Sequence, residues 1–231
     1  MRRTAGALEL LDGPVPMADR AAALADIERL SSWFGGYALT LREVHRLAAR
    51  APGDRALVVL DIGGGAAGLA VRAVRQARRR GRTIRVVVLE REAATLALAR
   101  RACAAFPEIF LVRADATALP VRSRTADVAT CSLTLHHLEP DEAVASLSEM
   151  ARATRLGVIL NDLLRTRFAC VLVWLGTRLL RCHPISRHDG PLSVRRAYSP
   201  PELAALAARA GLGPLAIRRH PVVGRLVAVA S

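Results

Sequence analysis

The sequence predicts an α/β fold: a doubly wound, mostly parallel sheet of seven strands with an antiparallel strand at its C-terminal end. Two observations predict it. From residue 56 onward, short apolar runs alternate with segments of helical periodicity, which is typical of parallel strands joined by right-handed crossover helices. Near the end of the chain, the apolar runs 215–217 and 226–229 have no helical segment between them, which predicts a closing antiparallel pair.

The other strands and helices follow in order from the same alternation. The first apolar run is broken only by Asp61 and has the composition of a strand buried on both faces. The predicted strands are 57–62, 84–89, 109–112, 126–132 and 157–160, and the predicted helices between them are 66–80, 92–105 and 140–154.

Two regions lie outside this alternation. Residues 1–53 are predicted to form an N-terminal helical cap, with helical periodicity over 18–50 interrupted at Gly35-Gly36, and the main domain then covers 54–231. Within that domain, 163–199 is predicted to be an insertion that covers the substrate: an apolar helix over 163–182, then an irregular stretch. A helix should begin at Pro200, with Ser199 as its N-cap.

The formal charge of +14 is weak support for a nucleic-acid partner. The chain contains no lysine, and its arginines are scattered apart from residues 78–80, whereas nucleic-acid binders usually cluster their basic residues. The longest apolar stretch, 168–180, is too short to span a bilayer, so peripheral contact is the strongest membrane association expected.

The chain is expected to be a cytoplasmic protein without a structural metal. The N-terminus lacks the apolar region of a signal peptide, and the four cysteines form no CxxC pair, so they are predicted to be free thiols rather than metal ligands or disulfides. No metal site is predicted from this sequence, and the oligomeric state stays open.

A glycine turn after the first strand is the strongest functional signal. Asp61 is followed by Gly63 and Gly65, a turn that lets a ligand approach the backbone at a helix start. Glu90 ends the second strand, where a carboxylate can accept both hydroxyls of a ribose. The GxGxxG spacing leaves an NAD(P)-type site as an alternative. Asp61 opposes a pyrophosphate, however, and suits a cationic ligand.

Together with two later segments, this turn resembles the class I methyltransferases that use S-adenosylmethionine (AdoMet). The first segment, 114–120, resembles the loop after strand three, which implies that Asp115 binds the adenine amino group and Ala116 supplies a backbone amide. The second, 126–138, resembles the fourth strand and the turn that borders cofactor and acceptor. The resemblance covers roughly residues 56–162 and implies a Rossmann-like fold with AdoMet as cofactor. Ala67 stands where the family has its third glycine.

The acceptor site is predicted from residues outside these motifs. His136 and His188 are the candidate catalytic residues, because histidine titrates near neutral pH. In the family that the sequence resembles, the histidine equivalent to His136 often has a structural role. The predicted pocket residues come from the cap, the two turns after strands four and five, and the apolar helix: Trp33, Tyr37, His137, Asn161 and Trp174.

These residues favour a small-molecule methyltransferase with a hydrophobic or phenolic acceptor. The segments 33–36 and 187–193 also resemble a bacterial subgroup that serves secondary metabolism, which implies O-methylation of a phenol or enol. The alternatives are an RNA or protein methyltransferase, suggested by the basic charge, and a binding protein that retains the fold without activity.

Overall fold

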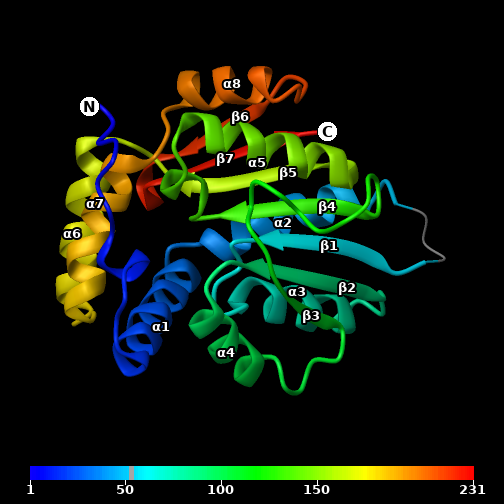
Figure 1. The fold of residues 1–231 in the computed structure, drawn as a ribbon, viewed down its shortest axis with the longest axis horizontal. Coiled ribbons are helices and arrows are strands. Elements are labelled where there is room, and N and C mark those ends of the chain that lie inside the picture. The colour runs from blue at the N-terminus through cyan, green and yellow to red at the C-terminus, as the bar shows by residue number, and fades with distance from the viewer. Residues whose placement is uncertain (52–54) are drawn as a thin grey trace.

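The sheet has seven strands in the order β3-β2-β1-β4-β5-β7-β6 (Figure 1). The structure is a computed structural model that describes residues 1–51 and 55–231. All pairs among the first five strands are parallel, whereas β7 runs antiparallel to both β5 and β6, as predicted. The strands are β1 Leu57–Ile62, β2 Ile84–Glu90, β3 Ile109–Arg113, β4 Ala126–Ser132, β5 Thr154–Leu163, β6 Ala216–His220 and β7 Arg225–Ala230.

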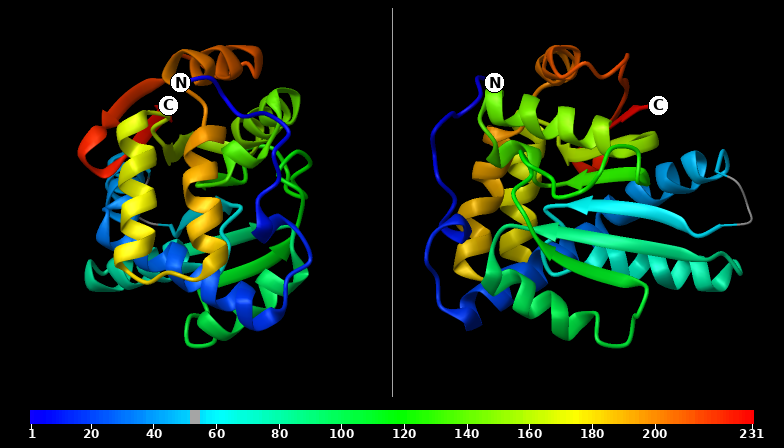
Figure 2. Two further views of the ribbon diagram at one scale, coloured as in Figure 1. Left: turned by 90° about the vertical axis from the view of Figure 1, so that its left-hand side faces the viewer. Right: turned by 45° about the vertical axis from the view of Figure 1, so that its right-hand side comes forward.

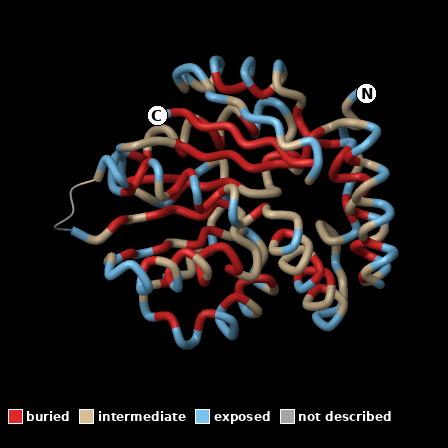
Figure 3. Tube along the Cα trace, turned by 180° about the vertical axis from the view of Figure 1, so that it is seen from behind, coloured by how far each residue is buried: buried red, intermediate tan, exposed pale blue. Residues whose placement is uncertain are grey.

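Helices cover both faces of this sheet. One face packs against α2, α3 and α4, and the other packs against α5 and α8, with a separate core cluster on each side. Figure 3 shows the buried strands running between these layers. The helices are α1 Met17–Trp33, α2 Gly36–Ala48, α3 Gly68–Arg79, α4 Ala93–Ala102, α5 Pro140–Ala153, α6 Arg167–Leu179, α7 Pro184–Arg196 and α8 Pro200–Arg209, with short 3-10 turns η1 Leu10–Asp12, η2 Leu135–His137 and η3 Pro221–Val223.

The N-terminal region forms two helices that meet at Gly35, as the interrupted helical periodicity over 18–50 predicted. Gly35 has a φ of 72°, in the left-handed region that favours glycine, and this ends α1 and starts α2. The predicted boundary between cap and main domain, at residues 53 and 54, lies outside the described residues. Because α2 packs on the sheet beside β5, the cap shares its core with the main domain.

The prediction of an irregular stretch over 183–199 was wrong. Residues 184–196 form the helix α7, which lies antiparallel to α6 at the end of the sheet (Figure 2). The stretch contains Gly190 and Pro191, which predict a helix break. The helix forms because α6 packs closely against it: a side-chain carbon on Gly190 would lie 2.8 Å from Val173. Glycine therefore fits this helix contact.

The boundary between β5 and α6 differs from the prediction, whereas the start of α8 agrees with it. Strand β5 extends to Leu163 and so shortens the apolar helix, which starts at Arg167 with Thr166 as its N-cap. The predicted cap of α8 is confirmed, because Ser199 and Glu202 form a reciprocal capping box. In the described part of the chain, none of the helices combines the length and the hydropathy that crossing a membrane requires.

Candidate active site

A cavity of about 700 Å³ lies at the carboxyl ends of β1, β2, β4 and β5. Ligands bind at this edge in open α/β sheets, since the strand order reverses between β1 and β4 there. The helices α1, α6 and α7 and the N-terminal segment 6–13 contribute the remaining walls. Figure 2 shows this segment running beside α7. The volume lies within the range of small-molecule sites.

The glycine turn after β1 brings bare backbone to the cavity. Gly63 has a φ of 63°, and a side-chain carbon there would collide with Thr134. Gly65 has a φ of 56° and faces open space, with its nearest neighbour Leu24 3.9 Å from such a carbon. Ala67 keeps the same left-handed backbone, with a φ of 67°, although it carries a side chain. The turn therefore retains its shape at the position where the family has a glycine.

Asp61 lies directly beneath this turn and is only 2% exposed. Thr130 donates a hydrogen bond of 2.8 Å to Asp61 Oδ1, whereas Oδ2 has no hydrogen-bond partner among the described residues. Burial, together with the nearby carboxylate of Glu90, raises the pKa of Asp61 to about 7. A buried carboxylate with an unpaired oxygen is stabilised by a cationic or hydrogen-bond-donating ligand.

Glu90 ends β2 at the opposite side of the turn and lines the cavity. Its Oε2 accepts a hydrogen bond from the amide of Gly65 at 3.2 Å, and its Oε1 accepts one from Glu92 at 3.0 Å. These amides fix the carboxylate beside the turn. The parallel pairing of β1 with β2 therefore gathers both predicted carboxylates at one end of the cavity.

Asp115 and Ala116 lie further along the same wall, in the loop after β3. Both line the cavity. Asp115 is exposed, and its Oδ1 accepts hydrogen bonds from both the amide and the hydroxyl of Thr117, which lower the pKa of the carboxyl. These bonds shape the loop and keep Asp115 ionised at the edge of the cavity.

The other end of the cavity contains two adjacent histidines in η2, after β4. His136 is 2% exposed, and its Nδ1 lies 2.7 Å from Asp162 Oδ1. The Nδ1 of His137 lies 3.1 Å from Asp12. A carboxylate therefore holds the inner nitrogen of each ring, which leaves both Nε2 atoms free to face other groups.

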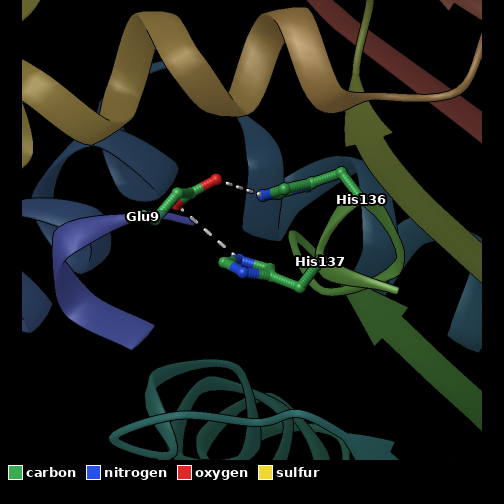
Figure 4. Close-up of side chains that lie close together, drawn as sticks. All are labelled: Glu9, His136 and His137. Carbon is green, nitrogen blue, oxygen red and sulfur yellow. Dashed lines mark ion pairs between the residues drawn. The ribbon is translucent and has the colours of Figure 1, made fainter. Parts of the chain in front are cut away.

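Glu9 faces these two Nε2 atoms, as Figure 4 shows. Its carboxylate oxygens lie 3.6 Å from His136 Nε2 and 3.8 Å from His137 Nε2. Burial raises the pKa of Glu9 to about 7 despite the hydrogen bond that Ser193 donates to it. Sequence reasoning missed Glu9. The signal available was a single carboxylate inside the apolar run 7–11, a pattern with no periodicity to interpret.

The N-terminal segment is held over the cavity by a network from α7. Asp189 accepts hydrogen bonds from the amides of Leu10 and Leu11, at 2.8 and 3.0 Å. Arg196 donates to the backbone carbonyls of His136 and His137 and so ties α7 to η2. These contacts join parts of the chain that are more than 50 residues apart.

The remaining predicted residues divide into two groups. Tyr37 and Asn161 line the cavity. Asn161 donates to the carbonyl of Gly36 at 2.7 Å, and burial raises the pKa of Tyr37. Trp33, Trp174 and His188 do not line it: the indoles are 66% and 47% exposed, and His188 is a half-exposed surface residue that pairs with Asp189.

Comparisons with known proteins agree with this geometry. Residues 59–157 match the family model described as a methyltransferase domain. No curated protein has a sequence significantly similar to this chain.

Several solved structures share the fold at low sequence identity. The citrinin polyketide synthase CMeT domain is 14% identical to this chain, with a TM-score of 0.63. The alignment covers 81% of this chain and about half (49%) of that one. A SAM-dependent methyltransferase from Aquifex aeolicus is 15% identical with a TM-score of 0.60, and 82% of this chain covers 87% of it. Human N-acetylserotonin methyltransferase in complex with SAM is 14% identical with a TM-score of 0.67, covering 93% of this chain and 56% of that one.

The family match includes Asp61 on β1, Glu90 at the end of β2 and Asp115 in the loop after β3. Residues 59–157 therefore match a methyltransferase domain, and the chain has the Rossmann-like fold of the solved AdoMet-dependent methyltransferases.

Proposed function

We propose that this protein is an AdoMet-dependent methyltransferase that methylates a small hydrophobic acceptor, with a phenolic or enolic oxygen as the favoured atom. The observation that carries the proposal is a single cavity that reaches from Glu90 to the buried His136. Apolar side chains from α1, α6 and β5 line much of the space between them: Ile27, Leu30, Leu163, Leu172 and Val173. An apolar wall of this kind favours a hydrophobic acceptor.

The glycine-turn end fits the cofactor. AdoMet supplies a methyl group on a positively charged sulfur, and it also carries an ammonium group. Asp61 has a buried, unpaired Oδ2 that such a charge would stabilise, and Gly63 and Gly65 leave the backbone open to the ligand. We assign the ribose hydroxyls to Glu90 and the adenine edge to Asp115 and Ala116.

The histidine end fits activation of the acceptor. Asp162 holds Nδ1 of His136, so that the lone pair of the neutral ring is at Nε2, inside the cavity. We assign His136 as the residue that activates the acceptor hydroxyl, with His137, Tyr37 and Asn161 as pocket residues. Nε2 of His136 would accept the hydroxyl proton as the acceptor oxygen bonds to the methyl carbon, and the electron pair of the broken carbon–sulfur bond would stay on sulfur.

Carbon methylation is the second candidate, because three of the similar structures are described as carbon methyltransferases or a CMeT domain. An enolate presents both oxygen and carbon to the methyl group, so the same activated end would serve either atom. A putative O-methyltransferase from Nostoc punctiforme has a TM-score of 0.66 and covers 99% of this chain, which supports the oxygen acceptor.

The test is turnover of isotopically labelled AdoMet with a panel of phenols and polyketide-like enols, read by mass spectrometry and NMR. We expect a methylated product from at least one hydrophobic acceptor, and loss of AdoMet binding by calorimetry in Asp61→Ala and Glu90→Ala. If both variants bind AdoMet as the parent does, the assignment of the cofactor end is wrong. If only polar macromolecules are methylated, the small-acceptor proposal is wrong.

A further inference from the structure

The three side chains Glu9, His136 and His137 converge on one point at the acceptor end (Figure 4). One ligand atom from each lies within 4.8 Å of the others. Metal bonds of about 2.0–2.2 Å to imidazole nitrogen and carboxylate oxygen allow ligand atoms up to roughly 4 Å apart. The two distances from Glu9, 3.6 and 3.8 Å, lie within that limit.

We infer that Glu9, His136 and His137 bind a divalent transition-metal ion at the acceptor end of the cavity. Two imidazole nitrogens and one carboxylate oxygen suit Zn²⁺ and its neighbours in the first row more than Mg²⁺ or Ca²⁺. Three protein ligands leave a fourth position open, which is the arrangement of catalytic rather than structural zinc sites.

The second independent observation is the set of groups behind the two histidines. Metal-binding histidines usually donate their other ring N–H to a carboxylate or carbonyl, which fixes the tautomer and the ring orientation. Both rings have this feature: Nδ1 of His136 pairs with Asp162 at 2.7 Å, and Nδ1 of His137 pairs with Asp12 at 3.1 Å. Both Nε2 lone pairs are thereby directed toward Glu9.

The local charge also favours a cation. Four carboxylates surround the three ligands or belong to them, whereas the guanidinium group of Arg196 lies beside Glu9 and that of Arg225 lies near Asp162. Arg196 Nη1 lies 4.0 Å from Glu9 Oε1, but its Nε and Nη2 are bonded to the carbonyls of His136 and His137. The carboxylates are Glu9, Asp12, Asp162 and Asp189, and the guanidinium groups are those of Arg196 and Arg225.

The open position gives the ion a role that rests on the proposed function. An acceptor hydroxyl bound there would ionise at a lower pH and release its proton to water, as zinc-bound water does in hydrolytic enzymes. With the ion bound, Nε2 of His136 would hold the metal, and the ion would take over the activation of the hydroxyl that the proposed function assigns to the free imidazole.

The experiment is a titration of the full-length, chelator-treated protein with Co²⁺ in the absence of AdoMet. We expect visible absorption bands of low-symmetry Co²⁺ that saturate at one equivalent and are displaced by Zn²⁺. Glu9→Gln and His137→Ala should each weaken Zn²⁺ binding by about 100-fold, and Asp12→Asn by about 10-fold or more. His188→Ala is the matched control, because His188 also pairs with a carboxylate but lies outside the cavity.

The inference would be overturned by the absence of saturable binding at one equivalent, or by equal binding in Glu9→Gln, His137→Ala and His188→Ala. Strong thiolate-to-cobalt bands would also overturn it, since they would place the metal on cysteines. His137 has a partly exposed side chain, so its variant remains informative if Glu9→Gln fails to fold. Calorimetry with AdoMet on the same samples separates this outcome from failure of the cofactor assignment.

Discussion

The two ends of the cavity are built in different ways. At the glycine-turn end, the proposed cofactor end, Asp61 and Glu90 lie on neighbouring parallel strands, beside the backbone amides of one turn. At the histidine end, the proposed acceptor end, Glu9, His136 and Asp189 come from three distant segments and are held by side-chain contacts. The sheet therefore fixes the first end, whereas the second is complete only while the N-terminal segment stays in place.

Removal of residues 1–13 should produce the largest difference between the effect on catalysis and the effect on AdoMet binding. The deletion takes away Glu9 and Asp12 and opens the cavity to water, so we expect kcat/KM for the acceptor to fall by about 100-fold or more. The AdoMet affinity should change by less than about threefold, because Asp61 and Glu90 remain on the sheet. Activity assays and calorimetry on the same protein check this. A parallel loss of both quantities would mean that the two ends are not independent.

Glu90→Gln tests the cofactor end alone. Hydrogen bonds to a charged group contribute about 1.5–3 kcal/mol, so the AdoMet dissociation constant should rise by roughly 10- to 100-fold. Calorimetry measures the change, and Glu108→Gln, which removes one negative charge outside the cavity, serves as a control for altered charge. An affinity within threefold of the parent protein would remove Glu90 from the ribose site.

Asp189→Asn probes the anchor of the N-terminal segment. Leu10 and Leu11 donate to different oxygens of Asp189, so an asparagine, which has a single acceptor oxygen, keeps at most one of the two bonds. We therefore expect kcat/KM for the acceptor to fall by about 10-fold. The control is His188→Ala, which removes the exposed partner of Asp189 and leaves both backbone bonds. Equal kinetics in the two variants would show that Asp189 does not position the segment.

The binding of AdoMet should depend on pH through Asp61. Its pKa of about 7 in the free protein means that the carboxyl must lose a proton before it can hold a cation. Affinity should therefore be about 10-fold weaker at pH 6 than at pH 8. Asp61→Asn should bind more weakly at pH 8 and lose this part of the pH dependence. If Asp61→Asn shows the same pH dependence of AdoMet affinity as the parent protein, Asp61 is not the titrating group.

The same shift predicts the opposite pH trend for the stability of the free protein. The pKa of Asp61 is raised from its ordinary value of 3.8, so the folded state retains a proton that the unfolded chain releases. The Asp61 contribution to the free energy of unfolding is thus complete below about pH 4 and is lost as the pH rises through 7. Urea unfolding at several pH values, compared with Asp61→Asn, isolates this term.

Ala67→Gly should produce the smallest effect. Ala67 holds a left-handed backbone, which costs an alanine about 1–2 kcal/mol, and glycine removes this strain at some cost in chain entropy. We expect the free energy of unfolding to rise by about 0.5–1 kcal/mol in urea denaturation, with AdoMet affinity unchanged. A destabilised variant would mean that the buried methyl group contributes more than the strain costs.

Short-range patterns were sufficient for the sheet and for one end of the cavity. Five predicted strands begin or end within a few residues of their observed bounds, because each strand has its own apolar run between turn residues. Asp61 and Glu90 follow from the same logic, since parallel strands bring their carboxyl ends to a single edge, whereas Asp115 was implied by the resemblance to the methyltransferase family. The glycine turn placed its residues without any distant contact.

Long-range packing accounts for the remainder. The helix over 184–196 was not predictable because Gly190 and Pro191 disfavour a helix locally and become tolerable only against α6. Trp33 and Trp174 are aromatic residues of the kind that often line apolar pockets. Their exposure depends on how α1 and α6 are rotated in the folded protein. Glu9 is part of no local sequence pattern. It is buried beside two histidines that lie more than 120 positions away in the sequence. Its raised pKa comes from these folded surroundings, which the sequence alone does not reveal.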